Sequence, residues 1–412
     1  MINTSLFDGK RKEKTEQILQ SLNINVLSGS AAEQLPVIIA NDLAGQPTLI
    51  VSDDKNDGVY LRSLKEAFGS IGLSVSVCIF STEKEETAVA RLISCGENFR
   101  CIIAVGGEDV INVCRFYSGL KNKYVFAVPN TVDVQGIIPP YVTFTANGLP
   151  ENVKSKTIDT LFLDKSAYYR CKKHDLADAF SSSVSKCLTL VDYKYACAAE
   201  GKELSPTAYN YFVEAINDAL NIPSSSCVYD WLLKSQLKIS IAKAISDIDE
   251  YSACGDVAKI LLATDKTVSE QEAEFVAFIR LVKLYRMYID DLDFVLLNTP
   301  DFCSRINEVA SFMGVRVSDV LAEVNSSLSV DEKRGEEAVK ALKPKLIKEL
   351  DGVIALLGKI KDFKVKLCNP KKPMNKFSAL QIKKSIALGA YTGKKPTILK
   401  LMNLSGYCQL LD

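Results

Sequence analysis

The sequence predicts an α/β fold in its N-terminal part, with a parallel, Rossmann-like, nucleotide-binding sheet, followed by an all-α C-terminal part. Three observations lead to this fold class. Short apolar runs alternate with helical segments, the run Cys101–Val105 ends at a Gly106-Gly107 turn that opens a helix, and beyond Cys171 long segments of helical period replace the strand signals. Strand, glycine turn, helix and strand in this order form a unit that places a phosphate at a helix N-terminus.

The N-terminal elements follow one another in a regular rhythm. Residues 1–35 predict a polar lead-in with one amphipathic helix near Lys12–Leu22. The expected strands are Pro47–Ser52, Ser74–Phe80, Cys101–Val105 and Tyr124–Val128, and the expected helices are Tyr60–Ile71, Glu83–Cys95 and a stretch around Val110–Phe116. Shorter strands at Tyr141–Thr145 and Thr160–Leu163 flank a polar loop, Asn147–Lys156.

Helices dominate the rest of the chain. They are expected near Leu176–Cys187, Thr207–Leu220, Val228–Ile245, Asp256–Ala263, Glu270–Asp290 and Arg316–Val324. We therefore expect two domains, 1–168 and 169–412. Residues 331–372 are rich in Lys and Glu, with Leu and Ile at helical spacing. They predict a solvated helix with one apolar face, and a functional basic patch that includes Lys371 and Lys372 is the alternative.

Composition excludes several function classes. Fifty basic residues balance fifty acidic ones, so the sequence offers no general attraction for nucleic acid. No apolar run approaches the ~20 residues of a membrane span, and the N-terminus leads into polar residues instead of an apolar signal core. Twelve scattered cysteines without a CxxC pair predict reduced thiols in a cytoplasmic protein and argue against structural zinc.

Several segments carry a family resemblance in their order and spacing. These are Leu49–Asp54, Val105–Phe116, Val128–Thr131, Asp133–Ile137, Asp164, Asp178 and Lys395–Leu399. On these motifs the chain resembles bacterial glycerol-1-phosphate dehydrogenases, in the group that contains dehydroquinate synthase, glycerol dehydrogenase and iron-containing alcohol dehydrogenases. The resemblance implies a dehydroquinate-synthase-like fold with NAD(P), a divalent metal and a homodimeric assembly.

The resemblance also implies which residues bind the cofactor. They are Asp53, Gly106, Gly107, Asp109, Asn130 and Thr131. A carboxylate such as Asp53 at a strand end can accept hydrogen bonds from a ribose. Its position is equally consistent with a helix N-cap or a turn residue. Glu108 stands where the family has a glycine, and a carboxylate beside a diphosphate repels it. The alternative is a helix start that Asp109 caps internally and that binds no phosphate.

The metal and substrate positions depart further from the family. The family's Asp and two His fall on Asp178, Asp256 and Glu270, with Glu272 in place of Glu270 if the register slips. Such carboxylates favour Mg or Mn over Zn. Without a cation they would repel one another, so a relaxed site is the alternative.

Gln135 and Asp178 are the candidate catalytic residues. Gln135 replaces a family Asp and can hydrogen-bond a substrate hydroxyl without acting as a base. Ile260 replaces a second family histidine. His174, the only histidine of the chain, is either a catalytic substitute or an ordinary surface or capping residue.

The resemblance implies an NAD(P)-dependent dehydrogenase that acts on a small phosphorylated polyol of the glycerone phosphate and glycerol-1-phosphate class. The substitutions lie at positions where the family has its cofactor-binding, metal-binding and catalytic residues. They motivate an alternative, a degenerate and non-catalytic member that binds a ligand or a partner. A different reaction with a hard cation, such as a lyase, is a third possibility that no residue selects.

Overall fold

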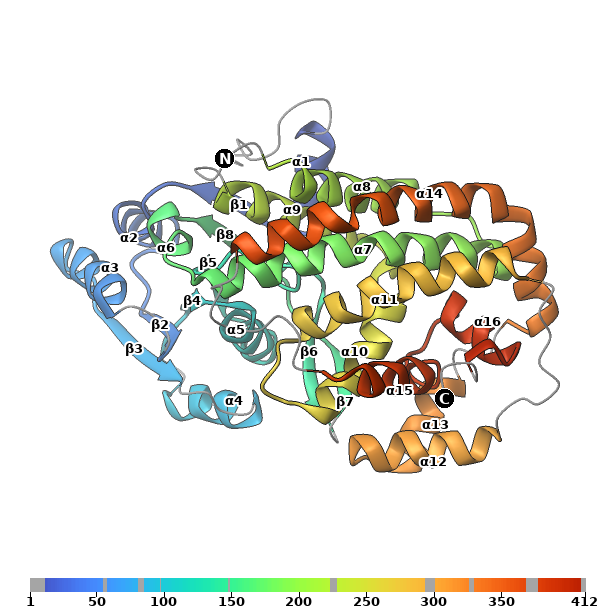
Figure 1. Ribbon diagram of the computed structural model, residues 1–412. Coiled ribbons are helices and arrows are strands. Elements are labelled where there is room, and N and C mark those ends of the chain that lie inside the picture. Colours follow the sequence, from blue (N-terminus) through green and yellow to red (C-terminus); the bar gives the residue numbers. More distant parts are fainter. Residues whose placement is uncertain are drawn as a thin grey trace. The chain divides into compact units, whose positions relative to one another are not determined.

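The computed structural model describes residues 12–54, 58–80, 85–96, 98–146, 149–222, 228–292, 301–325, 330–367 and 377–408 (Figure 1). The chain forms two compact units. The sheet unit holds residues 1–146, 150–176 and 223–244, and the helical unit holds residues 147–149, 177–222 and 245–412. The sequence suggested a single boundary after residue 168, whereas the contacts return residues 223–244 to the first unit.

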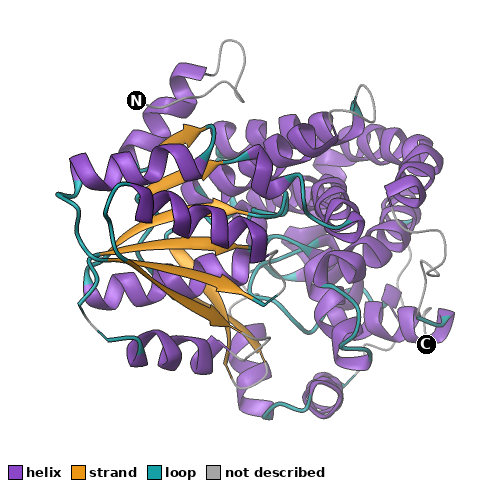
Figure 2. Ribbon diagram, turned by 90° about the vertical axis from the view of Figure 1, so that its left-hand side faces the viewer, coloured by secondary structure: helices purple, strands orange, loops and turns teal. Residues whose placement is uncertain are grey.

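The sheet unit is organised around a parallel sheet, drawn in orange in Figure 2. Within the described residues it has six strands in the order β1-β8-β5-β4-β2-β3, and each recorded pairing is parallel. The strands are β1 (Asn25–Ser28), β2 (Thr48–Asp53), β3 (Val75–Phe80), β4 (Cys101–Gly106), β5 (Tyr124–Pro129) and β8 (Thr160–Leu163). All of β4 is buried, as expected for a central strand with helices on both faces.

The helices of the sheet unit are α1 (Lys12–Ser21), α2 (Ala31–Asp42), α3 (Gly58–Ser70), α4 (Glu85–Ser94), α5 (Glu108–Lys121), α6 (Lys165–Tyr168) and α9 (Val228–Ile245). One apolar core joins α2, α3 and α6 to alternate residues of the strands. It includes Leu35, Leu64, Ile103, Phe126 and Phe162, all almost fully buried. This core fixes the sheet and therefore the positions of its strand ends.

Two expectations for this unit are wrong. Residues 1–35 are not a lead-in with a single helix, because β1 and the start of α2 lie there. β1 has only four residues, too few for a visible alternation, and α2 contains Pro36, which ordinarily argues against a helix interior. The segment 147–156 is not a polar loop, since β7 (Leu149–Lys154) pairs with β6 (Tyr141–Ala146).

The helical unit confirms the expected all-α second part. Its helices are α7 (Lys173–Glu200), α8 (Pro206–Leu220), α10 (Ala253–Thr264), α11 (Glu270–Asp290), α12 (Phe302–Met313), α13 (Val317–Asn325), α14 (Glu332–Leu367), α15 (Ala379–Gly389) and α16 (Ile398–Leu404). The first residues of α7 belong to the sheet unit. α14 buries Leu346, Leu350, Leu357 and Ile360 on one face, as the Leu and Ile spacing predicted, whereas Lys371 and Lys372 lie outside the described residues.

Candidate functional site

The turn between β4 and α5 has the geometry of an anion cradle. Gly107 is the N-cap of α5 and contributes no side chain to the first N–H groups of the helix, where the helix dipole favours negative charge. A Cβ at Gly107 would meet Thr131 Cγ2 at 3.7 Å, an ordinary contact. At Gly106 a Cβ would lie 2.7 Å from Val110, so this glycine is required by strand–helix packing. Unlike Gly106, Gly107 is therefore not required by strand–helix packing.

Glu108, the first residue of α5, directs its carboxyl group at a neighbouring loop. Its Oε2 accepts a hydrogen bond from Gly136 N at 2.9 Å, and its Oε1 accepts one from Asn112 Nδ2 at 3.4 Å. A Cβ at Gly136 would collide with this carboxyl group. Burial raises the pKa of Glu108, against the opposing influence of Lys243 and Arg115. Because the carboxyl group is bound inside the protein, it repels a diphosphate less than its position in the sequence suggests.

Arg115 fixes the loop that Glu108 contacts. Its fully buried guanidinium donates to Asn112 Oδ1 at 2.7 Å and to backbone carbonyls of Gly136, Pro139, Tyr141 and Lys156. Burial lowers the pKa of Arg115 to about 10, so it remains charged at neutral pH. Sequence reasoning missed this residue. Its signal was a lone arginine within the apolar stretch Val110–Phe116.

The remaining predicted cofactor residues lie at the ends of neighbouring strands of the sheet unit. Asn130 N donates to Gly106 O at 3.2 Å and so joins the end of β5 to the end of β4. Thr131 follows beside Gly107, and half-buried Gln135 precedes Gly136. Asp53 ends β2, the strand that pairs with β4 on its other side. Asp109 is exposed and is the second residue of α5, so the idea that it is the N-cap is wrong.

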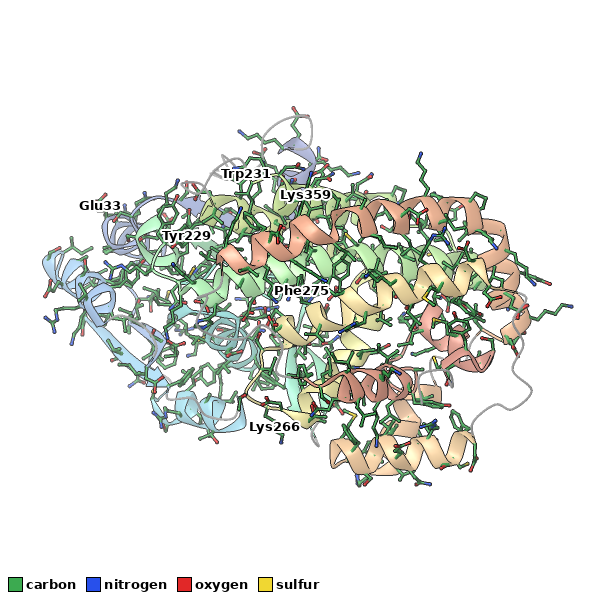
Figure 3. The ribbon with its side chains drawn as sticks, in the orientation of Figure 1. Glu33, Tyr229, Trp231, Lys266, Phe275 and Lys359 are labelled. Carbon is green, nitrogen blue, oxygen red and sulfur yellow. The ribbon has the colours of Figure 1, made fainter. Side chains whose placement is uncertain are left out.

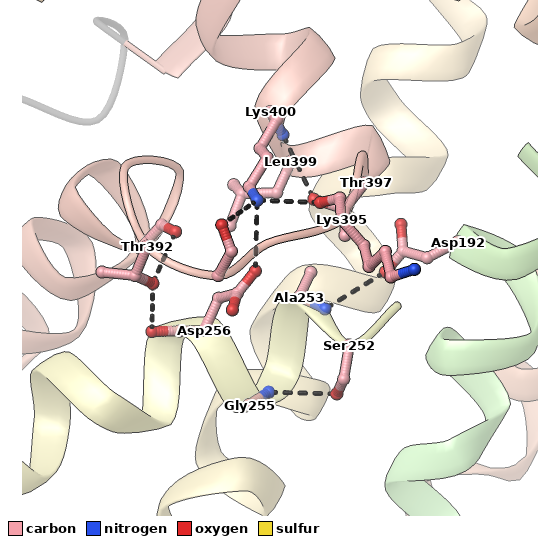
Figure 4. Close-up of polar contacts among 12 residues, drawn as sticks. Asp192, Ser252, Ala253, Gly255, Asp256, Thr392, Lys395, Thr397, Leu399 and Lys400 are labelled. Atoms are coloured by element: carbon pink, nitrogen blue, oxygen red, sulfur yellow. Dashed lines mark hydrogen bonds and ion pairs between the residues drawn. The ribbon is translucent and has the colours of Figure 1, made fainter. Parts of the chain in front are cut away.

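Asp256 lies in a self-contained network of the helical unit (Figure 4). Its carboxylate is 3.9 Å from Lys259 Nζ and 4.0 Å from Lys400 Nζ, and a Cβ at Gly393 would collide with it. Lys400 Nζ also donates to Gly393 O at 2.9 Å and to Lys395 O at 2.8 Å. Two lysines therefore offset the negative charge of a residue that is only 5% exposed.

Asp192 joins two helix starts next to this network. Its buried carboxylate accepts hydrogen bonds from Ala253 N at 3.4 Å, Ile398 N at 2.9 Å and the Tyr285 hydroxyl at 3.0 Å. It thus satisfies the first N–H groups of α10 and α16. Asp178 lies 14 residues earlier on α7, which corresponds to about 21 Å along a helix. The acid of α7 that reaches the start of α10 is therefore Asp192.

The predicted metal ligands do not fit a divalent cation. Asp178 is half-buried on α7, and Glu270 is the exposed first residue of α11. Among the residues that the structure describes, no group of three or more His, Cys, Asp or Glu is placed to hold a metal ion. His174 is exposed, and its Nε2 lies 3.1 Å from Asp175 Oδ1, as expected for a surface residue. No chemistry is therefore assigned to a bound metal.

Comparison with known proteins finds a family model that matches part of the sheet unit. Residues 26–171 match the family model described as iron-containing alcohol dehydrogenase. This part of the chain is therefore similar to that family. The match covers the strands from β1 to β8 and confirms the resemblance seen in the sequence motifs.

Sequence relatives of this chain include two proteins named glycerol-1-phosphate dehydrogenase [NAD(P)+]. The protein of Geobacillus thermodenitrificans is 22% identical over 177 residues, which are 41% of this chain and 44% of the relative. The protein of Archaeoglobus fulgidus is 22% identical over 160 residues, which are 39% of this chain and 45% of the relative. The matched part thus spans about half the length of these relatives.

Solved structures of similar fold cover nearly the whole chain. Sulfoacetaldehyde reductase from Bifidobacterium kashiwanohense in complex with NAD+ has a TM-score of 0.57 at 12% identity and covers 94% of this chain and 97% of its own. An iron-containing alcohol dehydrogenase from Thermotoga maritima has a TM-score of 0.54 at 14% identity and covers 94% and 98%. These matches confirm the predicted fold class. No helix in the described ranges is long and apolar enough to cross a membrane.

Proposed function

We propose that this chain is an NAD(P)-dependent dehydrogenase of a small phosphorylated polyol, in the class of glycerone phosphate and glycerol-1-phosphate. The match of residues 26–171 to the iron-containing alcohol dehydrogenase model and the names of the sequence relatives support the reaction type and this substrate class. The single observation that carries the proposal is the β4–α5 turn. There Gly107 leaves the start of α5 open, while the carboxyl group of Glu108 is bound to Gly136.

In this proposal the sheet unit binds the dinucleotide. The N–H groups at the start of α5 hold the pyrophosphate beside Gly107, and Gly106 keeps the helix close to the sheet. Asp53 accepts hydrogen bonds from the adenosine ribose, and Asp109, Asn130 and Thr131 complete the surroundings. Bound NAD(P) supplies the hydride acceptor or donor.

Gln135 and Asp178 are the proposed catalytic residues. The Gln135 amide, one residue before the anchored Gly136, orients a substrate hydroxyl or carbonyl by hydrogen bonding. Asp178, in the helical unit, is the second candidate. No group of three or more His, Cys, Asp or Glu in the described part of the chain is placed to hold a metal ion, so no role is proposed here for a metal. A homodimer and a cytoplasmic location complete the proposal, and size-exclusion chromatography tests the first of these.

A matched pair of glycine variants tests the cofactor site. We expect NADH or NADPH at ~100 times its dissociation constant to stabilise the wild-type chain by about 2.7 kcal/mol, seen as a rise in melting temperature. Gly107→Val should abolish this rise, because its side chain fills the approach to the helix start. Gly69→Val is the control, since a Cβ there meets nothing within 4 Å. Absence of a rise in the wild-type chain would contradict dinucleotide binding.

A second candidate is a non-catalytic family member that binds the dinucleotide or another ligand without turnover. The observation that favours it is the network in which lysines offset Asp256, with no metal centre among the described acids. Reduction of glycerone phosphate by NADH or NADPH, assayed after chelation and with added Mn²⁺ or Zn²⁺, separates the two. Turnover supports the dehydrogenase, whereas a melting-temperature rise without turnover in any condition supports the non-catalytic protein.

A further inference from the structure

The sheet unit has a pocket outside the predicted cofactor site. It lies at the carboxyl ends of β1 and β8, where Ser28 pairs with Leu163, and has a volume of about 690 Å³. This volume is within the range of small-molecule sites, and ligands of parallel sheets bind outside the carboxyl ends of strands. β5 separates β8 from β4, so the pocket is roughly 10 Å, two strand spacings, from the Gly106-Gly107 turn.

The two acids of the pocket already accept hydrogen bonds from the protein. Asp164 Oδ2 accepts from Tyr60 Oη at 2.9 Å and from Ala31 N at 2.8 Å, while its Oδ1 accepts from the Ser166 N–H and hydroxyl. The start of α2 is therefore attached to the end of β8. An incoming cation or donor finds little free acceptor capacity at Asp164.

The carboxylate oxygens of Asp230, on α9, also accept hydrogen bonds from the protein. It accepts from Lys165 Nζ at 2.8 Å, Tyr168 Oη at 2.8 Å and Tyr169 Oη at 2.9 Å. These three donors outweigh partial burial and hold the pKa of Asp230 below its usual value. The negative charge of Asp230 is thus matched by Lys165, whereas Asp164 accepts its hydrogen bonds from neutral donors.

Lys234 differs from these groups. In the described part of the chain no carboxylate lies within ion-pair distance of its ammonium, which instead lies 5.4 Å from the centroid of the Trp231 ring, one helical turn earlier on α9. Trp231 also lines the pocket and is labelled in Figure 3. Ser30 adds a hydroxyl that accepts from Glu33 N, so its hydrogen is left to donate. Lys234 and Ser30 are therefore donors that a ligand can use, and they lie beside an indole.

We propose that this pocket binds a small aromatic anion, with its ring against Trp231 and its carboxylate or phosphate at Lys234 and Ser30. The carboxylates of the pocket already accept hydrogen bonds from the protein, and Lys234 is a pocket cation with no carboxylate within ion-pair distance among the described residues, so an anionic group is the partner that it favours. The indole supplies a flat apolar surface for a ring. The inference is independent of the proposed dehydrogenase function, since it uses none of the predicted cofactor residues.

The chain offers a specific probe of this pocket, because Trp231 is its only tryptophan. We expect phenyl phosphate and benzoate, titrated separately, to change the tryptophan fluorescence with saturation, and the tighter of the two identifies the anionic group. Lys234→Ala should weaken that binding at least tenfold. Lys234→Met, which keeps the aliphatic stem on the indole, should weaken it equally if charge is the cause. Lys65→Ala, at an exposed lysine of α3, is the matched control.

Three outcomes would overturn the proposal. The fluorescence could respond linearly without saturation, the two Lys234 variants could bind as tightly as the control, or phenol could bind as tightly as phenyl phosphate. Competition by NAD+ would overturn the claim that the pocket is separate from the dinucleotide site. A failed dinucleotide titration with intact phenyl phosphate or benzoate binding would reject the proposed function alone.

Discussion

At the scale of single residues, Asp192 gives the clearest dependence on pH. Burial and, to a smaller extent, nearby Asp256 raise its pKa from 3.8 to about 7, against hydrogen bonds from Ile398 N, Tyr285 and Ala253 N. Between about pH 4 and pH 7 the folded state therefore holds more protons than the unfolded state. As the pH rises through this window, the free energy of unfolding should fall by up to roughly 4 kcal/mol. Above about pH 7 it should level off.

Urea denaturation at a series of pH values measures this effect. Asp192→Asn should flatten the dependence between about pH 4 and pH 7, because the amide does not titrate there. Asp42→Asn, at an exposed acid at the end of α2, should leave the slope unchanged. An Asp192→Asn profile parallel to that of the wild-type chain would show that this carboxyl group titrates normally.

At the scale of elements, Arg115 joins α5 to the loop that carries Gln135. Arg115→Met should destabilise the protein by at least about 3 kcal/mol, since it leaves buried carbonyls of Gly136, Pro139 and Tyr141 without their donor. Arg62→Met, at an exposed position of α3, should change stability by less than about 0.5 kcal/mol. Chemical denaturation of both variants compares them, and equal stabilities would rule out an anchoring role for Arg115.

Some of these elements were predicted correctly from the sequence, and others were missed. The β4–α5–β5 unit and the helix Val228–Ile245 were predicted because their apolar runs are long and their ends are marked. β1 was missed because four residues carry too little pattern. Glu108 was interpreted by residue type as a phosphate-repelling group, and only the bond to Gly136, 28 residues away, shows where its carboxyl group lies. Such long-range pairings leave no local signal.

At the scale of the whole molecule, the arrangement of the acids leads to a prediction for the metal content of the purified protein. We expect the purified protein to carry no stoichiometric Zn, Fe, Mg or Mn, and chelation to leave its melting temperature unchanged, because a bound ion would stabilise the folded state. Elemental analysis and a melting curve with and without chelator measure this. One equivalent of metal whose removal lowers the melting temperature would show that the acids do converge on an ion.

Residues 223–244 belong to the sheet unit although they follow part of the helical unit in the sequence, and this order has a consequence for folding during synthesis. Ser240 of α9 accepts a hydrogen bond from Ile138 N, and Asp230 binds Lys165, so α9 completes a unit whose last strand ended at Leu163. During synthesis the sheet must wait for some eighty further residues, including α8, before α9 leaves the ribosome. A nascent chain from which α9 has not yet emerged would therefore leave uncovered the surface that α9 covers in the folded protein.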